Sequence, residues 1–194
     1  MPFADEIHGS VSVLDYQADW PDEFELIAGK LVAALGHHAL AVDHVGSTSV
    51  PGLPAKDCID VQVRTADLDG DGLVETMEGL GFRLRPEPWN VLETSSGTES
   101  RKRVFAPPVG ARSCNIHFRL FDGPNARYAL LFRDYLRTDA AARAGWGAFK
   151  QRLAVSVSDW ADYGQIKAPA TEVLIAGAER WARETGWSPT PGRS

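Results

Sequence analysis

The chain has 194 residues, 44% of them hydrophobic, and a formal net charge of −6 at pH 7. This length and apolar content fit one domain with a single core, and the negative charge argues against non-specific binding to nucleic acid, which depends on Lys and Arg neutralising phosphates. The sequence shows no secretory signal at its N-terminus and no apolar stretch near the ~20 residues of a membrane span, so we expect a cytoplasmic protein that does not bind membranes.

Hydrophobic periodicity and turn residues predict the elements in chain order. A short strand is expected at 11–14, followed by a helix that Asp19 caps and Gly36 ends. The later elements are expected as strands at 40–45 and 58–64, a helix at 67–80, strands at 82–85, 90–93, 101–105 and 114–120, and helices from 125, over 139–155 and over 168–184. Two prolines and a glycine in 187–194 predict a flexible tail after a domain of residues 1–186.

A glycine and three hydroxyl side chains follow the strand expected at 40–45. Gly46 allows a tight turn, and the amides and hydroxyls of Ser47, Thr48 and Ser49 are suited to donate to phosphate oxygens. Lys56, a few residues later, either binds a phosphate or carboxylate or is simply exposed. This segment therefore predicts a cradle for an anion.

Polar residues alternate with apolar ones on two of the expected strands. Asp60 and Gln62 share one face of the first strand, and Asn115, His117 and Arg119 share one face of the second. A carboxylate in an apolar strand is costly unless it is paired or bound, so Asp60 is a candidate site residue; the alternative is a structural ion pair. His117 is either a general acid or base or a hydrogen-bonded structural histidine.

Three segments resemble the GrpB family, a branch of the nucleotidyltransferase fold. They are His44 to Lys56 (HVGSTSVPGLPAK), Ile59-Asp60, and Leu131 to Arg137 (LFRDYLR), within a looser resemblance from about Val11 to Trp181. The resemblance implies an α/β (α+β) single domain with a mixed sheet, helices packed on one face and a polar cleft on the other. It also implies a transferase-like activity on a nucleotide-binding fold.

In catalytic members of that fold, two carboxylates on one strand, and often a third on a neighbouring strand, hold Mg²⁺, which bridges the nucleotide phosphates. The resemblance therefore implies Mg²⁺ as a cofactor, with Asp60 as its ligand. The second carboxylate position is Gln62, whose amide adds no negative charge and cannot act as a base, and the third falls on Asn115 or His117. These departures argue against ordinary two-metal nucleotidyl transfer.

Two further clusters have alternative interpretations. The run of Arg101, Lys102 and Arg103 is either a solvated face or, through Arg101 and Arg103, part of the wall of the cleft. The acidic segment 67–78 has the spacing of an EF-hand calcium loop, but a strand precedes it where a helix belongs, so acidic residues at a helix N-terminus are the favoured interpretation.

The sequence thus supports two hypotheses. In the first, the protein transfers or condenses a small activated anionic substrate, for which a nucleotide derivative is one candidate, with Asp60 and His117 as catalytic residues. The proposed substrate-binding residues are Gly46, Ser47, Thr48, Ser49, Lys56, Gln62, Arg101, Arg103 and Asn115. In the second, the domain is a ligand-binding or regulatory module that has lost the metal carboxylates. The oligomeric state stays open.

Overall fold

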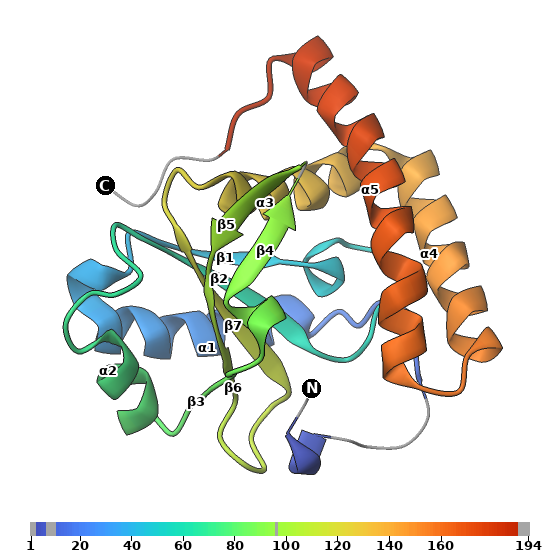
Figure 1. The fold of residues 1–194 in the computed structure, drawn as a ribbon. Helices are drawn as coiled ribbons and strands as arrows, with labels where there is room; N and C mark the ends of the chain where they lie inside the picture. Colours follow the sequence, from blue (N-terminus) through green and yellow to red (C-terminus); the bar gives the residue numbers. More distant parts are fainter. Residues whose placement is uncertain (1–2, 7–10, 96, 190–194) are drawn as a thin grey trace.

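A computed structural model describes residues 3–6, 11–95 and 97–189. Most of the expected elements are present, in the expected order (Figure 1). The α-helices are α1 (Trp20–Leu35), α2 (Leu73–Gly79), α3 (Pro124–Thr138), α4 (Ala140–Ser156) and α5 (Trp160–Thr185). The strands are β1 (Ala41–Val45), β2 (Ile59–Thr65), β3 (Arg83–Leu84), β4 (Leu92–Ser95), β5 (Thr98–Arg101), β6 (Arg103–Ala106) and β7 (Cys114–Leu120). Short 3-10 turns include η1 (Ala4–Glu6), η2 (Gly36–His38), η3 (Ser47–Ser49) and η4 (Pro88–Asn90).

The central sheet has the strand order β1-β2-β7-β6-β3. The β2 and β7 strands are parallel and the other neighbours are antiparallel, so the expected mixed α/β sheet is confirmed. In the register of β2 and β7, Asp60 lies beside Asn115 and Gln62 beside His117. The two polar rows expected from the sequence are therefore neighbours on one face of the sheet.

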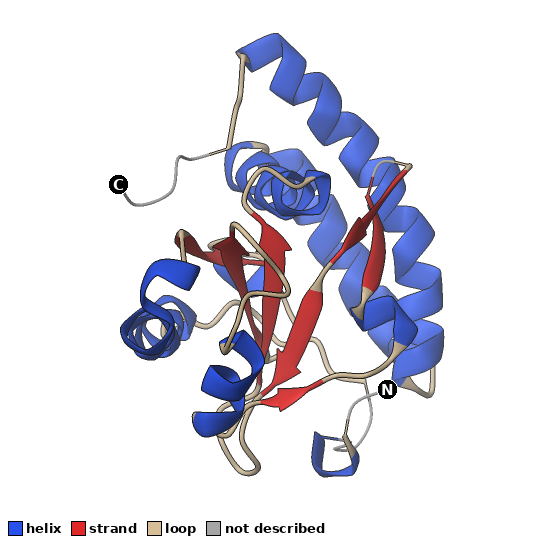
Figure 2. Ribbon diagram, turned by 60° about the vertical axis from the view of Figure 1, so that its left-hand side comes forward, coloured by secondary structure: helices blue, strands red, loops and turns tan. Residues whose placement is uncertain are grey.

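Helices lie on both faces of this sheet (Figure 2). The α1 and α2 helices cover one face, where the largest core cluster is centred on residues such as Leu31, Val61 and Phe118. The opposite face is covered at one end by α3 and the β4–β5 hairpin, and α4 and α5 pack beyond α3. The expectation that all helices pack on one face is therefore wrong: α1 and α2 cover that face, and α3 to α5 lie on the opposite side and form the wall of the cleft.

The largest differences from expectation concern four elements, and β3 and β4 also differ by one or two residues from the expected bounds. The predicted strand at 11–14 is wrong: it is reduced to a single bridge between Leu14 and Ala55. The strand expected at 101–105 is divided between β5 and β6. The helix expected from residue 67 begins at Leu73, because Asp67 accepts a hydrogen bond from the Asp69 amide and holds a turn there. The last helix begins at Trp160 rather than 168, because Asp159 caps its first amides.

The C-terminal end of the packed domain lies slightly beyond the expected boundary. Trp187, the first residue of the expected tail, packs beside Trp181 and donates from Nε1 to Asp134 Oδ2 at 3.1 Å. The remainder of that tail from residue 190 lies outside the described residues. Within the described part of the chain, no helix combines the length and the apolar content needed to cross a bilayer.

Candidate anion-binding site

The chain turns sharply at Gly46, directly after β1. Gly46 has φ 68° and ψ −168°, a conformation that is essentially restricted to glycine. A Cβ atom at this position would lie 2.4 Å from Asp60 Oδ2. Glycine is therefore required twice, for the backbone conformation and for the close approach to the carboxylate. The loop and Asp60 face each other, as the sequence predicted.

The side chain of His44 supports this loop. Its Nε2 atom lies 3.0 Å from Thr48 Oγ1, and its ring stacks on Phe24 with the centroids 4.7 Å apart. Burial lowers the pKa of His44 to about 4; the charge of Asp60 opposes this shift, and those of Arg137 and Arg133 add to it. The imidazole is consequently neutral at pH 7 and acts as a support for the loop.

Two arginines of α3 hold the loop from the other side. Arg133 donates to the His44 carbonyl at 3.2 Å, and Arg137 donates to the Ser49 carbonyl at 3.0 and 2.7 Å. The Ser49 hydroxyl donates to the Gly46 carbonyl at 2.6 Å. The segment at 131–137 therefore fixes the loop at 46–49, which explains in physical terms why the two motifs occur together.

These contacts leave one of the three loop hydroxyls for a ligand. Ser49 turns inward, so its expected place among the ligand donors is wrong. Thr48 borders the cavity, but its hydroxyl is used by His44. Ser47 also borders the cavity, and its hydroxyl has no hydrogen bond to any residue that the structure describes.

Asp60 is a charged group held by two β7 side chains. Asn115 Nδ2 donates to Asp60 Oδ1 at 3.0 Å, and His117 Nε2 lies 3.5 Å from the same oxygen. Burial raises the pKa of Asp60, but the contacts with His117 and Asn115 and the charge of Lys167 outweigh it and lower the pKa to about 2. Asp60 is thus ionised at neutral pH and is a poor general base.

His117 is adapted to orient Asp60. Burial lowers its pKa; the hydrogen bond to Asp60 opposes this shift, and the charges of Arg119 and Lys102 reinforce it. Its Nδ1 atom is buried and has no hydrogen-bond partner among the described residues. His117 does not border the cavity, so it contacts a bound ligand only through Asp60.

A cavity of about 380 Å³ opens between the Gly46 loop, the start of β2 and helices α3 to α5. Among the described residues that border it, three are lysines and one, Asp60, carries a carboxylate. The lining residues are Gly46, Ser47, Thr48, Ala55, Lys56, Cys58, Asp60, Asn115, Phe132, Lys150, Trp160, Tyr163, Lys167 and Thr171. The cavity has the size of a small-ligand site, and its wall carries a net positive charge.

Lys150 is the most deeply buried of these cations, with 2% of its surface exposed. Its Nζ atom donates to the Pro54 carbonyl, and no described carboxylate forms an ion pair with it. Burial and the charge of Lys167 lower the pKa of Lys150 to about 7. Burial lowers the pKa of Lys167 too, with Asp60 opposing and Lys56 adding to the shift.

Three residues expected in the cleft lie elsewhere. Gln62 is fully buried under α3, where it donates to Asp43 Oδ2 and the Ala126 carbonyl and accepts from Arg119. Arg101 and Arg103 both bind the carboxylate of Asp69. Arg103 pairs with Phe118 in the sheet, so its side chain points to the α1 and α2 face, and its expected place on the cleft wall is wrong, as is that of Arg101.

The sequence prediction missed the lysines and aromatic residues that α4 and α5 contribute. Trp160, Tyr163, Lys150 and Lys167 were all absent from the expected site residues. One signal was present: Lys150 falls four residues after Trp146 and three before Leu153, on the buried stripe of α4. A lysine at a core position of a helix indicates a site or a paired charge.

The donor set is poor for a metal that the protein would hold by itself. Among the described residues, no group of three His, Cys, Asp or Glu side chains is placed to hold a metal ion. Asn115 presents its amide nitrogen, not its oxygen, to Asp60. In the EF-hand-like segment the Asp69 carboxylate is used by the two arginines. Burial raises the pKa of the Cys58 thiol to about 11, so it is neither a ready ligand nor a nucleophile.

Fold and site together define an α/β protein with a basic, ligand-sized cavity beside a Gly-Ser loop at the end of a strand. A sequence model of the GrpB protein family matches residues 10–176, and the chain belongs to that family. A crystal structure of a GrpB protein from Enterococcus faecalis has a TM-score of 0.72 at 29% identity, covering 88% of this chain and 99% of that one.

Curated relatives fall into two groups. A UPF0157 protein of Halalkalibacterium halodurans is 34% identical over 148 residues, which cover 76% of this chain and 71% of that protein. A dephospho-CoA kinase of Mycolicibacterium paratuberculosis is 35% identical over 189 residues, which cover 88% of this chain and 46% of the kinase. The chain thus spans about half the length of the curated kinases it matches.

Proposed function

We propose that the protein binds a small phosphate-bearing anion in the cavity between the Gly46 loop and Lys150. The observation that carries this proposal is the burial of Lys150 without a carboxylate partner among the described residues. A buried ammonium group is costly unless a counter-charge compensates it. An anion in the cavity would supply that counter-charge.

The surroundings favour a phosphate group. Ser47 supplies a free hydroxyl and a tightly turned backbone, and Lys56 and Lys167 supply two more cations. Asp60 repels an anion from the opposite side unless a cation lies between them. Mg²⁺ that arrives with a polyphosphate would find in Asp60 its single carboxylate ligand, an arrangement that Mg²⁺ tolerates because it keeps several waters and phosphate oxygens.

In the enzymatic form of the proposal, the ligand is of nucleotide type. The protein transfers or condenses an activated group of this ligand. The lysines bind and orient the phosphates, Asp60 faces the reacting group, and His117 and Asn115 keep Asp60 ionised. The name of the dephospho-CoA kinase relatives suggests a phosphate-bearing substrate. This chain has no G-x-x-x-x-G-K-S/T phosphate loop, so we do not extend the kinase activity to it.

A second candidate is a non-catalytic module that binds the same anion. It is favoured by the position of Gln62, which replaces a metal carboxylate and is locked into a buried network with Asp43 and Arg119. Such a module keeps the anion cavity and lacks metal-assisted transfer.

Titration with ATP and with inorganic tripolyphosphate, with Mg²⁺ or with EDTA, distinguishes the two candidates. Thermal shift reports binding, and phosphorus NMR reports turnover. Asp60→Asn removes the repulsive charge, so it should strengthen metal-free binding and weaken Mg²⁺-dependent binding. Turnover that requires Mg²⁺ and Asp60 supports the enzyme, binding without turnover supports the module, and absence of both overturns the proposal.

We do not propose nucleic acid as the ligand. The net charge of −6 opposes it, and the arginines at 101 and 103 are paired with Asp69. Absence of RNA and DNA binding at low salt is the expected result, and salt-sensitive binding there would contradict it.

A further inference from the structure

A second, larger cavity adjoins the lysine cavity. It has a volume of about 590 Å³ and shares four lining residues with the first: Lys56, Cys58, Asn115 and Trp160. The two cavities therefore adjoin, with Lys56 at their common border. A ligand longer than a phosphate group would extend from one into the other.

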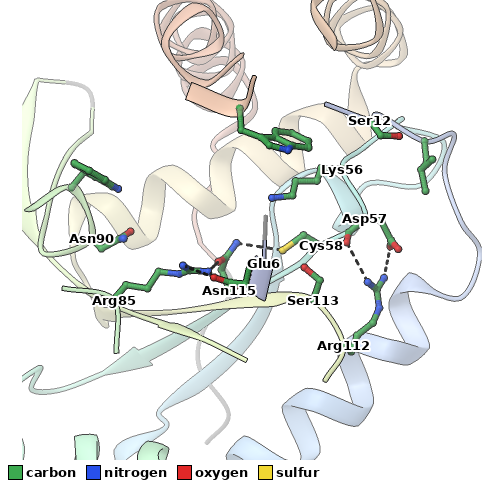
Figure 3. Close-up of a pocket in the computed structure, with 13 residues that line it drawn as sticks. Glu6, Ser12, Lys56, Asp57, Cys58, Arg85, Asn90, Arg112, Ser113 and Asn115 are labelled. Carbon is green, nitrogen blue, oxygen red and sulfur yellow. Dashed lines mark hydrogen bonds and ion pairs between the residues drawn. The ribbon is translucent and has the colours of Figure 1, made fainter. Parts of the chain in front are cut away.

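Apart from Lys56, the charged side chains of the larger cavity form ion pairs. Arg85 forms a two-pronged pair with Glu6 at 2.7 and 3.0 Å, and Arg112 binds Asp57 and, away from the cavity, Glu23. Figure 3 shows these two pairs on opposite sides of the cavity, with Lys56 reaching between them. Lys56 is the one lining cation that forms no ion pair with a described residue. This cavity is thus much less suited to a second anionic group than the lysine cavity is.

Aromatic rings and neutral polar groups complete the lining. Trp89, on the η4 turn, is 58% exposed, and no other described ring or cation packs on it. Trp160 lies under the ammonium group of Lys56, with Nζ 4.6 Å from the ring centroid. Asn90 and Ser113 add neutral hydrogen-bonding groups. An exposed tryptophan beside amides and hydroxyls suits a planar, uncharged heteroaromatic group.

We infer that the ligand has two parts, a phosphate bound at Lys150 and Lys167 and a heteroaromatic base bound in the larger cavity against Trp89. The ligand class is a nucleoside phosphate, which lies across Lys56. This inference rests on the proposed function, because it assigns the phosphate end to the cavity already described. It adds a recognition residue, Trp89, on an element distant from the Gly46 loop.

The test compares binding of ATP, GTP, CTP and UTP with that of inorganic tripolyphosphate, by calorimetry on the full chain, once with Mg²⁺ and once with EDTA. At least one nucleotide should bind about tenfold or more tightly than tripolyphosphate. Trp89→Ala should lower the affinity for that nucleotide by about 5- to 100-fold and leave the affinity for tripolyphosphate unchanged. Trp89→Phe should retain most of the affinity for the nucleotide. Leu26→Ala, at an exposed apolar residue on α1, is the control and should change neither affinity.

The possible failures are distinguishable. If tripolyphosphate binds in a Lys150-dependent manner but no nucleotide binds more tightly, or if Trp89→Ala has no effect, the base subsite is overturned and the anion cavity stands. If neither tripolyphosphate nor any nucleotide binds, the proposed function itself fails and this inference fails with it.

Discussion

The backbone of Gly46 and the carboxylate of Asp60 are in direct contact, so that a methyl group on Gly46 would lie 2.4 Å from Asp60 Oδ2. This contact joins the end of β1 to the start of β2 and sets the distance between the anion loop and the charged group opposite it. Both residues border the lysine cavity. The geometry of the candidate site therefore depends on this one close approach.

Gly46→Ala should displace Asp60 and disrupt the loop. We expect a loss of about 3 kcal/mol in the free energy of unfolding, measured in urea, because alanine adds both backbone strain and a clash. Gly52→Ala is a matched control: Gly52 also has positive φ, at 78°, but a Cβ there meets nothing within 4 Å. It should cost about 1–2 kcal/mol and leave anion binding intact. Equal effects of the two variants would show that the Asp60 contact is unimportant.

Lys150 should make the stability of the fold dependent on pH. Its pKa of about 7 lies below its ordinary value of 10.5, so the unfolded chain holds the proton more tightly than the folded protein between these values. The buried charge destabilises the fold fully below about pH 7, and stability is regained as the pH rises from 7 towards 10.5. The stability advantage of Lys150→Met over wild type, measured by urea unfolding, should therefore shrink across that range.

A bound anion should stabilise the charged form of Lys150. We therefore expect the wild type to take up a proton on binding sulfate at pH 8, measured by calorimetry in two buffers of different ionisation enthalpy. Lys150→Met should show no such uptake. A wild type that binds sulfate without proton uptake would contradict the assignment of Lys150 to the anion.

His44 should make the fold sensitive to mild acid. Its folded pKa of about 4 is below the unfolded value of 6.5, so its contribution is complete above pH 6.5 and is lost as the pH falls towards 4. The expected loss is up to about 3 kcal/mol at pH 4. His44→Gln should flatten this part of the profile in chemical unfolding experiments. Parallel profiles for the two proteins would refute the neutral, buried state of His44.

Arg101 and Arg103 should be dispensable for ligand binding. Both bind Asp69 on the surface, outside the cavity. Arg101→Gln should leave the affinity for tripolyphosphate unchanged and shift the melting temperature little, because exposed ion pairs contribute little. A marked loss of affinity on calorimetric titration would show that Arg101 takes part in ligand binding, as the sequence alone suggested.

Local patterns predicted the sheet and much of the loop correctly. Period-two alternation grouped Asp60 with Gln62 and Asn115 with His117, and the structure pairs these two rows. The need for glycine at 46 followed from its position after an apolar strand. The same alternation, applied to β6, assigns Arg103 to the opposite face, but this step requires the pairing of Arg103 with Phe118, which the sequence does not show.

The lysine wall could not be predicted because it is assembled from distant segments. Lys150 and Lys167 lie on α4 and α5 and reach the Gly46 loop only when these helices pack on α3. Periodicity shows which side of a helix is apolar, but not which strand end that side faces. The burial of Gln62 could not be predicted for the same reason, since α3 covers it only in the folded protein.

The central claim is that Lys150 lacks a counter-charge that a bound anion supplies. The most direct measurement is calorimetric titration of inorganic tripolyphosphate into wild type, Lys150→Met and, as a matched control, Lys30→Met on the exposed side of α1. We expect saturable binding to wild type and to Lys30→Met, and an affinity about 10- to 100-fold lower for Lys150→Met. Undetectable binding to wild type, or equal affinities for all three proteins, would contradict the account.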